Sequence, residues 1–257
     1  MKKVVVTMFT GLVLLLAAST QARAGIYVTY CVNGTAVQDS ASSCVGGTSG
    51  DFGVPVGSPG ALESYTGTIG SGGGQFTITG ISQSNSPGTP TLAKLLSSTL
   101  SILNITGSSQ RLELFMGDTG FLSPVGPPLI LNSHIGGSII TAGAGNTMSF
   151  ISCVGPGDAQ NPCPASFDYM AGPGTPIINT SASYKDDEFS TILVALATPY
   201  SISQYLDIHL DGGSEINSAA NTSLTTVPEP LSIALLGGIL VLSSGLIRRK
   251  TKRESAV

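Results

Sequence analysis

The sequence of 257 residues contains no tryptophan and only two histidines, and charged residues make up 10% of it against 41% hydrophobic residues. It also lacks the Gly-x-Ser-x-Gly, Gly-x-Gly-x-x-Gly and Walker motifs that mark an exposed nucleophile or a phosphate-binding loop. A glycosidase needs two carboxylates facing each other across a sugar bond, and the spacing of the acidic residues singles out no such pair. We therefore predict no catalytic residues, no cofactor and no enzymatic activity.

Positive charge is scarce in the middle of the chain. Between residues 25 and 226 only Lys94, Arg111 and Lys185 are basic, against thirteen acidic residues. Binding to nucleic acid depends on Lys and Arg side chains that neutralise phosphates. This acidic balance excludes nucleic acid as a partner.

The N-terminus has the three parts of a secretory signal peptide. Lys2 and Lys3 precede an apolar run over residues 4–18, and small residues, Ala22 and Ala24, stand at −3 and −1 of a cleavage site before Gly25. We expect residues 1–24 to be removed, so that the mature chain begins at Gly25 outside the cytoplasm. The alternative is a transmembrane anchor that stays uncleaved.

The C-terminus carries a short apolar segment between a proline-rich motif and a basic cluster. The motif is Val227, Pro228, Glu229 and Pro230, and residues 231–247 follow it without a charge. The basic residues after them are Arg248, Arg249, Lys250, Lys252 and Arg253. As a helix the 17 residues would span about 25 Å, close to the hydrocarbon thickness of a bilayer. By the positive-inside rule the basic cluster is a topological stop that stays cytoplasmic, which leaves residues 25–226 on the far side.

This arrangement resembles the PEP-CTERM sorting signal of Gram-negative bacteria over residues 227–253. The resemblance rests on Pro228-Glu229-Pro230, the adjacent short apolar segment and the terminal arginine-rich cluster, in that order. It implies that exosortase, a membrane-embedded cysteine transpeptidase-like enzyme, processes the chain near the motif. It also implies export across the inner membrane and a transient anchor, followed by release to the cell surface or an exopolysaccharide matrix. The alternative is a permanent single-pass anchor.

The exported segment is predicted to be an antiparallel β-sandwich over residues 25–213. Short β-branched and alternating runs are separated by Gly, Pro, Ser and Asn clusters, as in all-β domains. The predicted strands are 26–32, 62–69, 75–81, 99–106, 111–117, 138–141, 148–153, 189–197 and 201–210. One or two helical turns are an alternative for 91–98. Residues 214–226 are small and polar, which predicts a flexible linker to the membrane segment.

Four cysteines are expected to form structural disulfides, because the compartment outside the inner membrane is oxidising. Three pairings are possible, and the short separations favour Cys31 with Cys44 and Cys153 with Cys163. No Cys-x-x-Cys spacing is present, which argues against zinc and thioredoxin-like chemistry.

Few residues suggest a ligand site. Asp207, His209 and Asp211 alternate along one predicted strand, a pattern that presents three metal ligands or simply the wet face of an amphipathic strand. Asp186, Asp187 and Glu188 offer oxygen ligands or a solvated turn. We predict no bound metal. The seven tyrosines offer rings for stacking on sugars: Tyr27, Tyr30, Tyr65, Tyr169, Tyr184, Tyr200 and Tyr205.

Together these features predict an exported surface or matrix protein with a structural or interaction role in an exopolysaccharide biofilm matrix. Its expected partners are the secretion machinery, exosortase, the membrane through one C-terminal helix before processing, and exopolysaccharide. The alternative is a carbohydrate-binding module of the same matrix, and the third hypothesis is a secreted hydrolase.

Overall fold

The structure is a computed structural model, and it describes residues 25–36, 44–52, 62–71, 75–156, 169–171 and 183–227. All regular secondary structure in these residues is β-structure. Within the same residues, no helix is long and apolar enough to cross a membrane. The predicted signal peptide, the apolar C-terminal segment and the basic cluster lie outside the described residues.

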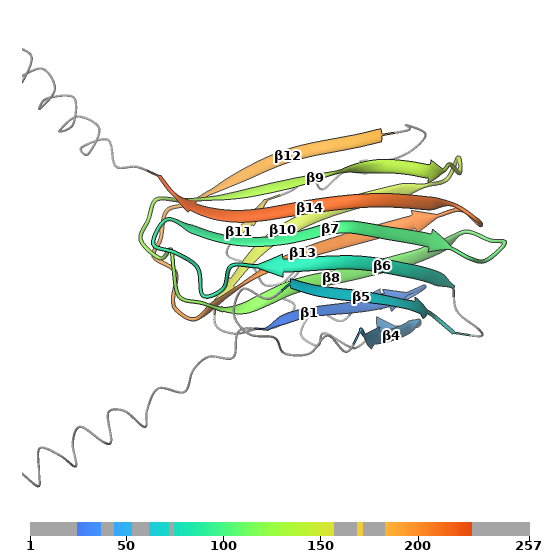
Figure 1. The fold of residues 1–257 in the computed structure, drawn as a ribbon, viewed down its shortest axis with the longest axis horizontal. Coiled ribbons are helices and arrows are strands. Elements are labelled where there is room, and N and C mark those ends of the chain that lie inside the picture. The colour runs from blue at the N-terminus through green and yellow to red at the C-terminus, as the bar shows by residue number, and fades with distance from the viewer. Residues whose placement is uncertain are drawn as a thin grey trace, which may run out of the picture.

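Two six-stranded antiparallel sheets pack face to face (Figure 1). Sheet 1 has the order β11 (Tyr169–Ala171), β10 (Thr147–Pro156), β13 (Tyr200–Leu210), β8 (Gln110–Phe121), β1 (Ile26–Val32) and β4 (Thr48–Asp51). Sheet 2 has the order β12 (Ser183–Ile192), β9 (Leu129–Thr141), β14 (Glu215–Thr226), β7 (Leu92–Asn104), β6 (Phe76–Ser84) and β5 (Leu62–Ile69). A small ribbon of β2 (Thr35–Ala36) and β3 (Cys44–Val45) lies beside β1. The predicted antiparallel β-sandwich is confirmed.

Alternation of side chains along each strand divides the sheets into an inner and an outer face. On β6, Phe76 and Ile78 are fully buried against sheet 1, whereas Thr77 and Thr79, which alternate with them, are more exposed. Successive strand residues point to opposite faces, so this pattern builds one dry face and one wet face. The predicted strands 26–32 and 62–69 match β1 and β5 residue for residue.

The space between the sheets holds two apolar clusters separated by a belt of polar side chains. The larger cluster includes Phe76, Leu114 and Phe150, and the smaller includes Phe121 and Tyr200. One buried polar residue from each of five strands lies between the two clusters, and we call this set the polar belt: Ser97, Ser133, Ser152, Gln204 and Thr222. Each belt residue hydrogen-bonds at least one other, which offsets the cost of burying it.

The prediction of a flexible linker at 214–226 is wrong, because residues 215–226 form β14, a central strand of sheet 2. It pairs with β7 on one side and with β9 on the other. Its inward residues Ile216 and Leu224 are fully buried, and Thr222 between them belongs to the polar belt. Small polar residues suit this position because they hydrogen-bond across the core, although their composition is typical of a linker.

The helical alternative for 91–98 is also wrong, because this segment begins β7. Ala93 and Leu95 are buried and alternate with more exposed residues, which is the period of a strand and not of a helix. The predicted strand 189–197 lies too far along the chain, because β12 ends at Ile192. Asp186, Asp187 and Glu188 therefore lie within a strand and not in a turn.

Candidate functional site on the outer face of sheet 2

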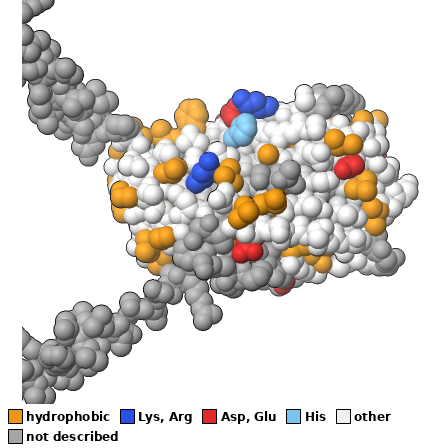
Figure 2. All heavy atoms as spheres, in the orientation of Figure 1, with side chains coloured by type: hydrophobic (Ala, Val, Ile, Leu, Met, Phe, Trp, Pro, Cys, Tyr) orange, Lys and Arg blue, Asp and Glu red, His pale blue; other side chains and the backbone are white. Residues whose placement is uncertain are grey.

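The outer face of sheet 2 is wide and open, and its charged side chains are Lys94, Lys185, Asp187 and Glu215. Outward-pointing residues on neighbouring strands lie opposite one another, so they form rows that run across the sheet. One row crosses all six strands with hydroxyl or amide side chains only, and we call it the hydroxyl–amide row: Thr66, Thr79, Ser101, Asn217, Ser138 and Ser183. With strands about 4.8 Å apart, the row is about 24 Å long. Figure 2 shows this face as mostly backbone and uncharged side chains, with scattered hydrophobic patches and a few charged side chains.

A large apolar side chain stands exposed on the same face, six residues along β12 from Ser183 of the row, with Lys185 and Asp187 between them. Phe189 on the edge strand β12 is 71% exposed, and it points outward because it lies opposite the outward-pointing Asn132 of β9. Side chains directly opposite in an antiparallel pair have Cβ atoms about 5 Å apart. The Phe189 ring and the Asn132 amide therefore form one small surface with an apolar part and a hydrogen-bonding part.

A charged group borders this surface. His134 of β9 lies opposite Asp187 of β12, and its Nδ1 contacts the Asp187 carboxylate. Lys185 Nζ lies 2.9 Å from the other carboxylate oxygen of Asp187. The hydrogen bond from Lys185, followed by that with His134, lowers the pKa of Asp187. Asp187 is therefore ionised at neutral pH and holds both basic side chains beside Phe189.

The pairing of His134 with Asp187 has the form of a base and the carboxylate that orients it, as in a hydrolase triad. Among the described residues, no hydroxyl hydrogen-bonds the other ring nitrogen of His134. The same part of the chain contains no group of three or more His, Cys, Asp or Glu residues placed to hold a metal ion. His134 and Asp187 can therefore contact a ligand, but in the described part of the chain no serine or threonine hydroxyl is placed for His134 to activate.

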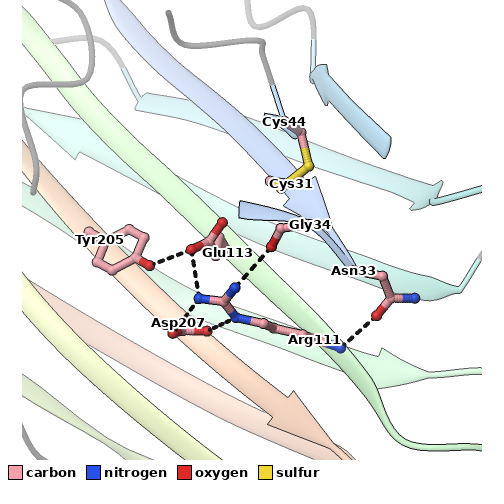
Figure 3. The surroundings of a disulfide bond; sticks show 8 residues. All are labelled: Cys31, Asn33, Gly34, Cys44, Arg111, Glu113, Tyr205 and Asp207. Carbon is pink, nitrogen blue, oxygen red and sulfur yellow. Dashed lines mark hydrogen bonds and ion pairs between the residues drawn. A yellow bond between two sulfur atoms is a disulfide. The ribbon is translucent and has the colours of Figure 1, made fainter. Parts of the chain in front are cut away.

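The candidate metal ligands Asp207, His209 and Asp211 do not form a common site. Asp207 lies on the outer face of sheet 1, where it accepts two hydrogen bonds from Arg111, from Nε at 2.9 Å and from Nη2 at 2.8 Å (Figure 3). His209 Nε2 is 3.8 Å from Asp207 Oδ1. Asp211 lies beyond the end of β13, where its carboxylate accepts a hydrogen bond from the backbone N–H of Gly145.

Arg111 is the centre of a polar cluster on that face. Besides Asp207 it binds Glu113 Oε1 at 2.8 Å and donates from Nη1 to the carbonyl oxygen of Gly34. Tyr205 donates to the same Glu113 oxygen at 2.8 Å. The hydrogen bond to Asp207 raises the pKa of Arg111 above its ordinary high value, so the guanidinium stays charged. This cluster joins β8, β13 and the turn after β1, and it explains why Asp207 is not available to a metal.

The disulfide between Cys31 and Cys44 is confirmed, with Cα atoms 5.5 Å apart (Figure 3). It ties the outer face of β1 to β3. Cys153 is also disulfide-bonded. Cys163 lies outside the described residues, so its pairing with Cys153 stays a prediction.

Tyrosine stacking on sugars is not supported for the six tyrosines whose side chains the structure describes. Tyr30 is partly buried, and the other five are no more than 8% exposed: Tyr27, Tyr65, Tyr184, Tyr200 and Tyr205. The exposed ring belongs to Phe189, which the sequence analysis missed. A signal was present, because Phe189 follows three acidic residues and precedes Ser190 and Thr191, an unusual setting for a core residue.

The predicted sorting motif begins where the described chain ends. The backbone N–H of Val227 donates to the carbonyl oxygen of Pro128 at 3.0 Å, directly after β14. Gly25 is the first described residue of the N-terminal segment. Pro228, Glu229, Pro230, the basic residues 248–253, Ala22 and Ala24 lie outside the described residues, so their roles stay predictions.

No family model matches the chain, and no curated protein matches it. Several solved structures are similar to it, among them two carbohydrate-binding domains and an adhesin domain. One is the carbohydrate-binding module TmCBM61, solved in complex with beta-1,4-galactotriose, at 7% identity and a TM-score of 0.28, covering 58% of this chain and 86% of that one. Another is the N-terminal cellulose-binding domain of beta-1,4-glucanase C from Cellulomonas fimi, at 14% identity and a TM-score of 0.28, covering 56% and 93%. The third is the adhesin domain of Epf from Streptococcus pyogenes, at 10% identity and a TM-score of 0.31, covering 80% and 60%. Likenesses of this size assign neither a family nor a function.

Proposed function

We propose that this chain is an exported surface or matrix protein whose β-sandwich binds a neutral polysaccharide on the outer face of sheet 2. The observation that carries the proposal is the exposed Phe189 ring beside Asn132 on a face otherwise dominated by hydroxyl and amide side chains. Sugar rings combine an apolar C–H face with a rim of hydroxyls. A binding site for such a ligand needs an aromatic ring that packs against the C–H face and uncharged groups that hydrogen-bond the hydroxyls.

Charge supports a neutral ligand over an anionic one. The segment from residue 25 to residue 226 carries ten more acidic than basic residues, which disfavours an approaching polyanion. On the outer face of sheet 2 the Lys185–Asp187–His134 group lies at one edge, and Lys94 lies opposite Ser223. The members of the hydroxyl–amide row are themselves uncharged, and Ser101 of the row donates a hydrogen bond to Glu215 Oε1 at 3.0 Å. A neutral chain lying across the strands would meet hydrogen-bonding groups along the whole row.

Delivery to the matrix is part of the same proposal. Signal peptidase would remove residues 1–24, and exosortase would process the chain near Pro228-Glu229-Pro230. Intact mass and C-terminal peptide mapping of protein from cell-surface and culture fractions test this. The expected form begins at Gly25 and ends near the motif. A chain that keeps residues 231–257 and occurs only in membranes would instead be a permanently anchored protein.

Glycan binding is tested by titrating neutral polysaccharides into the full-length protein in detergent micelles. The Phe189→Ala variant is expected to bind about tenfold more weakly, equivalent to about 1.4 kcal/mol. Phe189→Tyr should restore binding because it keeps the ring. Leu193→Ala is the matched control, since Leu193 is 74% exposed but follows the end of β12.

Two other outcomes identify the competing functions. No binding to any neutral polysaccharide by the wild-type protein would favour a structural role, in which the flat face packs against other matrix components. Release of sugars from a polysaccharide, lost in the His134→Ala variant, would favour a hydrolase that uses the His134–Asp187 pair.

A further inference from the structure

Both chain ends of the sandwich lie at the same end of the molecule. β1 begins at Ile26 opposite Asp118 near the end of β8, and β14 ends at Thr226 opposite Leu129 at the start of β9. Figure 1 shows the start of β1 and the end of β14 at the same end of the sandwich. We call this the exit end, because the C-terminal segment leaves from it.

Three loops at the exit end are joined by backbone hydrogen bonds. They are residues 85–91 between β6 and β7, residues 122–128 between β8 and β9, and residues 193–199 between β12 and β13. Leu122 N–H donates to Pro87 O at 2.9 Å, and Leu196 N–H donates to Val125 O at 3.1 Å. The N–H groups of Thr226 and Val227 donate to Thr91 O and Pro128 O. The last residues of β14 are therefore fastened to the same surface as the loops.

These three loops carry no charged residue, and they expose large apolar side chains. Leu193 is 74% exposed, Val194 is 51% exposed and Leu122 is 49% exposed. The described residues at the other end of the sandwich include Arg111, Asp211 and Glu215. The other end also exposes Ile105 and Ile140, so the feature that sets the exit end apart is exposed apolar side chains on loops without any charge. Such a surface indicates a contact with another apolar phase.

The chain that follows limits how far this surface can lie from a membrane. Only Pro228, Glu229 and Pro230 separate Val227 from residues 231–247, the 17 uncharged residues of the predicted membrane segment. Four residue steps reach about 14 Å when fully extended. The Val227 N–H is held by the sandwich, so no flexible linker adds to this distance.

We propose that the exit end contacts the membrane surface before processing, with Leu122, Leu193 and Val194 inserted at the boundary between lipid headgroups and acyl chains. The occupant of this surface is thus a lipid bilayer. This inference rests on the C-terminal anchor that is part of the proposed function. The contact would orient the sandwich with its exit end on the membrane and its strands pointing away from it. The outer face of sheet 2 would then lie parallel to the membrane normal and stay accessible to polysaccharide. It would also hold the Pro228-Glu229-Pro230 motif at the membrane surface.

The test uses the full chain reconstituted into phosphatidylcholine–phosphatidylglycerol vesicles. A thiol-reactive, environment-sensitive fluorophore is attached to Leu193→Cys or Leu122→Cys. The matched control is Ile140→Cys, since Ile140 is 54% exposed but lies near the end of β9 remote from the exit end. The described residues contain no free cysteine, and labelling of the parent chain gives the background. Lipids brominated on their acyl chains quench only probes that contact the bilayer, and iodide quenches probes in water.

We expect brominated lipid to quench the probes at 122 and 193 at least threefold more strongly than the probe at 140, and iodide to show the opposite order. Adding Leu193→Asp and Val194→Asp to the chain labelled at 122 should lower its quenching by brominated lipid, whereas adding Phe189→Asp should not. If iodide quenches the probes at 122 and 193 as strongly as the probe at 140, and the chain still resists carbonate extraction, the membrane contact is wrong and the anchor stands. Release of the chain by carbonate would overturn the anchor and the inference with it.

Discussion

The side chain of Gln204 on β13 donates a hydrogen bond from Nε2 to Thr222 Oγ1 on β14, at 2.9 Å, and so joins the two sheets across the core. Gln204 Oε1 accepts from Ser97 Oγ at 2.9 Å, which adds β7 to the same link. Thr222 also pairs with Ser152, and Ser152 with Ser133. The polar belt is therefore one connected set of hydrogen bonds with an apolar cluster on either side. A shift of one residue in any of these strands would bury an unpaired polar group, so the belt also fixes the register of the sheets.

Replacing the central residue of the belt should destabilise the protein. Gln204→Leu leaves Ser97 without its acceptor and Thr222 without its donor in a buried site, at a cost of about 1–3 kcal/mol in the free energy of unfolding. Urea denaturation measures this change. Gln83→Leu is the control, because Gln83 is exposed on β6 and should change stability by less than about 0.5 kcal/mol. Equal effects of the two substitutions would contradict a role for the belt.

The Arg111 cluster makes a second stability prediction. Arg111→Met removes the partner of Asp207 and of Glu113, whose side chain is only 4% exposed, and leaves a buried carboxylate without its cation. Because the Arg111 side chain is 28% exposed, solvent screens part of the loss, and we expect about 1–3 kcal/mol. Lys94→Met is the matched loss of one positive charge elsewhere on the sandwich. Adding Asp207→Asn to Arg111→Met should recover part of the stability, and a further loss would argue against a charge effect.

Two buried tyrosines predict a loss of stability at high pH. Burial raises the pKa of Tyr65 and of Tyr184 from 10.0 to about 12. The folded state keeps each phenol protonated while the unfolded state begins to ionise. The stabilisation is therefore fully present below pH 10 and is lost as the pH rises through 12. Each residue contributes about 2–3 kcal/mol to this change.

Tyr65→Phe and Tyr184→Phe should each make the dependence of unfolding free energy on pH shallower between pH 10 and pH 12. The comparison of slopes removes the loss of the Tyr184 hydrogen bond to Asn217 O, which lowers stability equally at all pH values below 10. Slopes identical to that of the wild-type protein would show that these phenols ionise in the folded state at their ordinary pKa.

Truncation before β14 tests whether residues 215–226 act as a structural strand or as a linker. A chain that ends at Gly213 lacks β14, so β7 and β9 lose the strand between them, and we expect no cooperative unfolding transition. A chain that ends at Val227 keeps every described strand and should unfold cooperatively. Thermal unfolding followed by circular dichroism compares the two. A cooperative transition in the shorter chain would mean that β14 is dispensable.

The sequence by itself determined the fold class and one disulfide. Period-two alternation between turn residues predicted an antiparallel sandwich, because alternation encodes the two faces of a sheet locally. The strands 26–32 and 62–69 could be placed to the residue for that reason. Cys31 and Cys44 lie close in sequence, so their pairing was accessible without knowledge of the fold. The signals at the two termini are local patterns as well, and they stay predictions about export and sorting.

Only the tertiary structure decided which polar residues are buried and which apolar ones are exposed. Residues 215–226 have the composition of a linker, yet they form a central strand in which Gln204 and Ser152 on sheet 1 hydrogen-bond the buried Thr222. Asp207 alternates with His209 and Asp211 as metal ligands on one strand would, but its carboxylate accepts hydrogen bonds from Arg111, which is 96 residues away in the sequence. Phe189 is apolar yet exposed because it points away from the core, opposite Asn132 on the outer face of sheet 2. In each case the partner is distant in sequence, and pairing between distant residues is set by packing and not by local pattern.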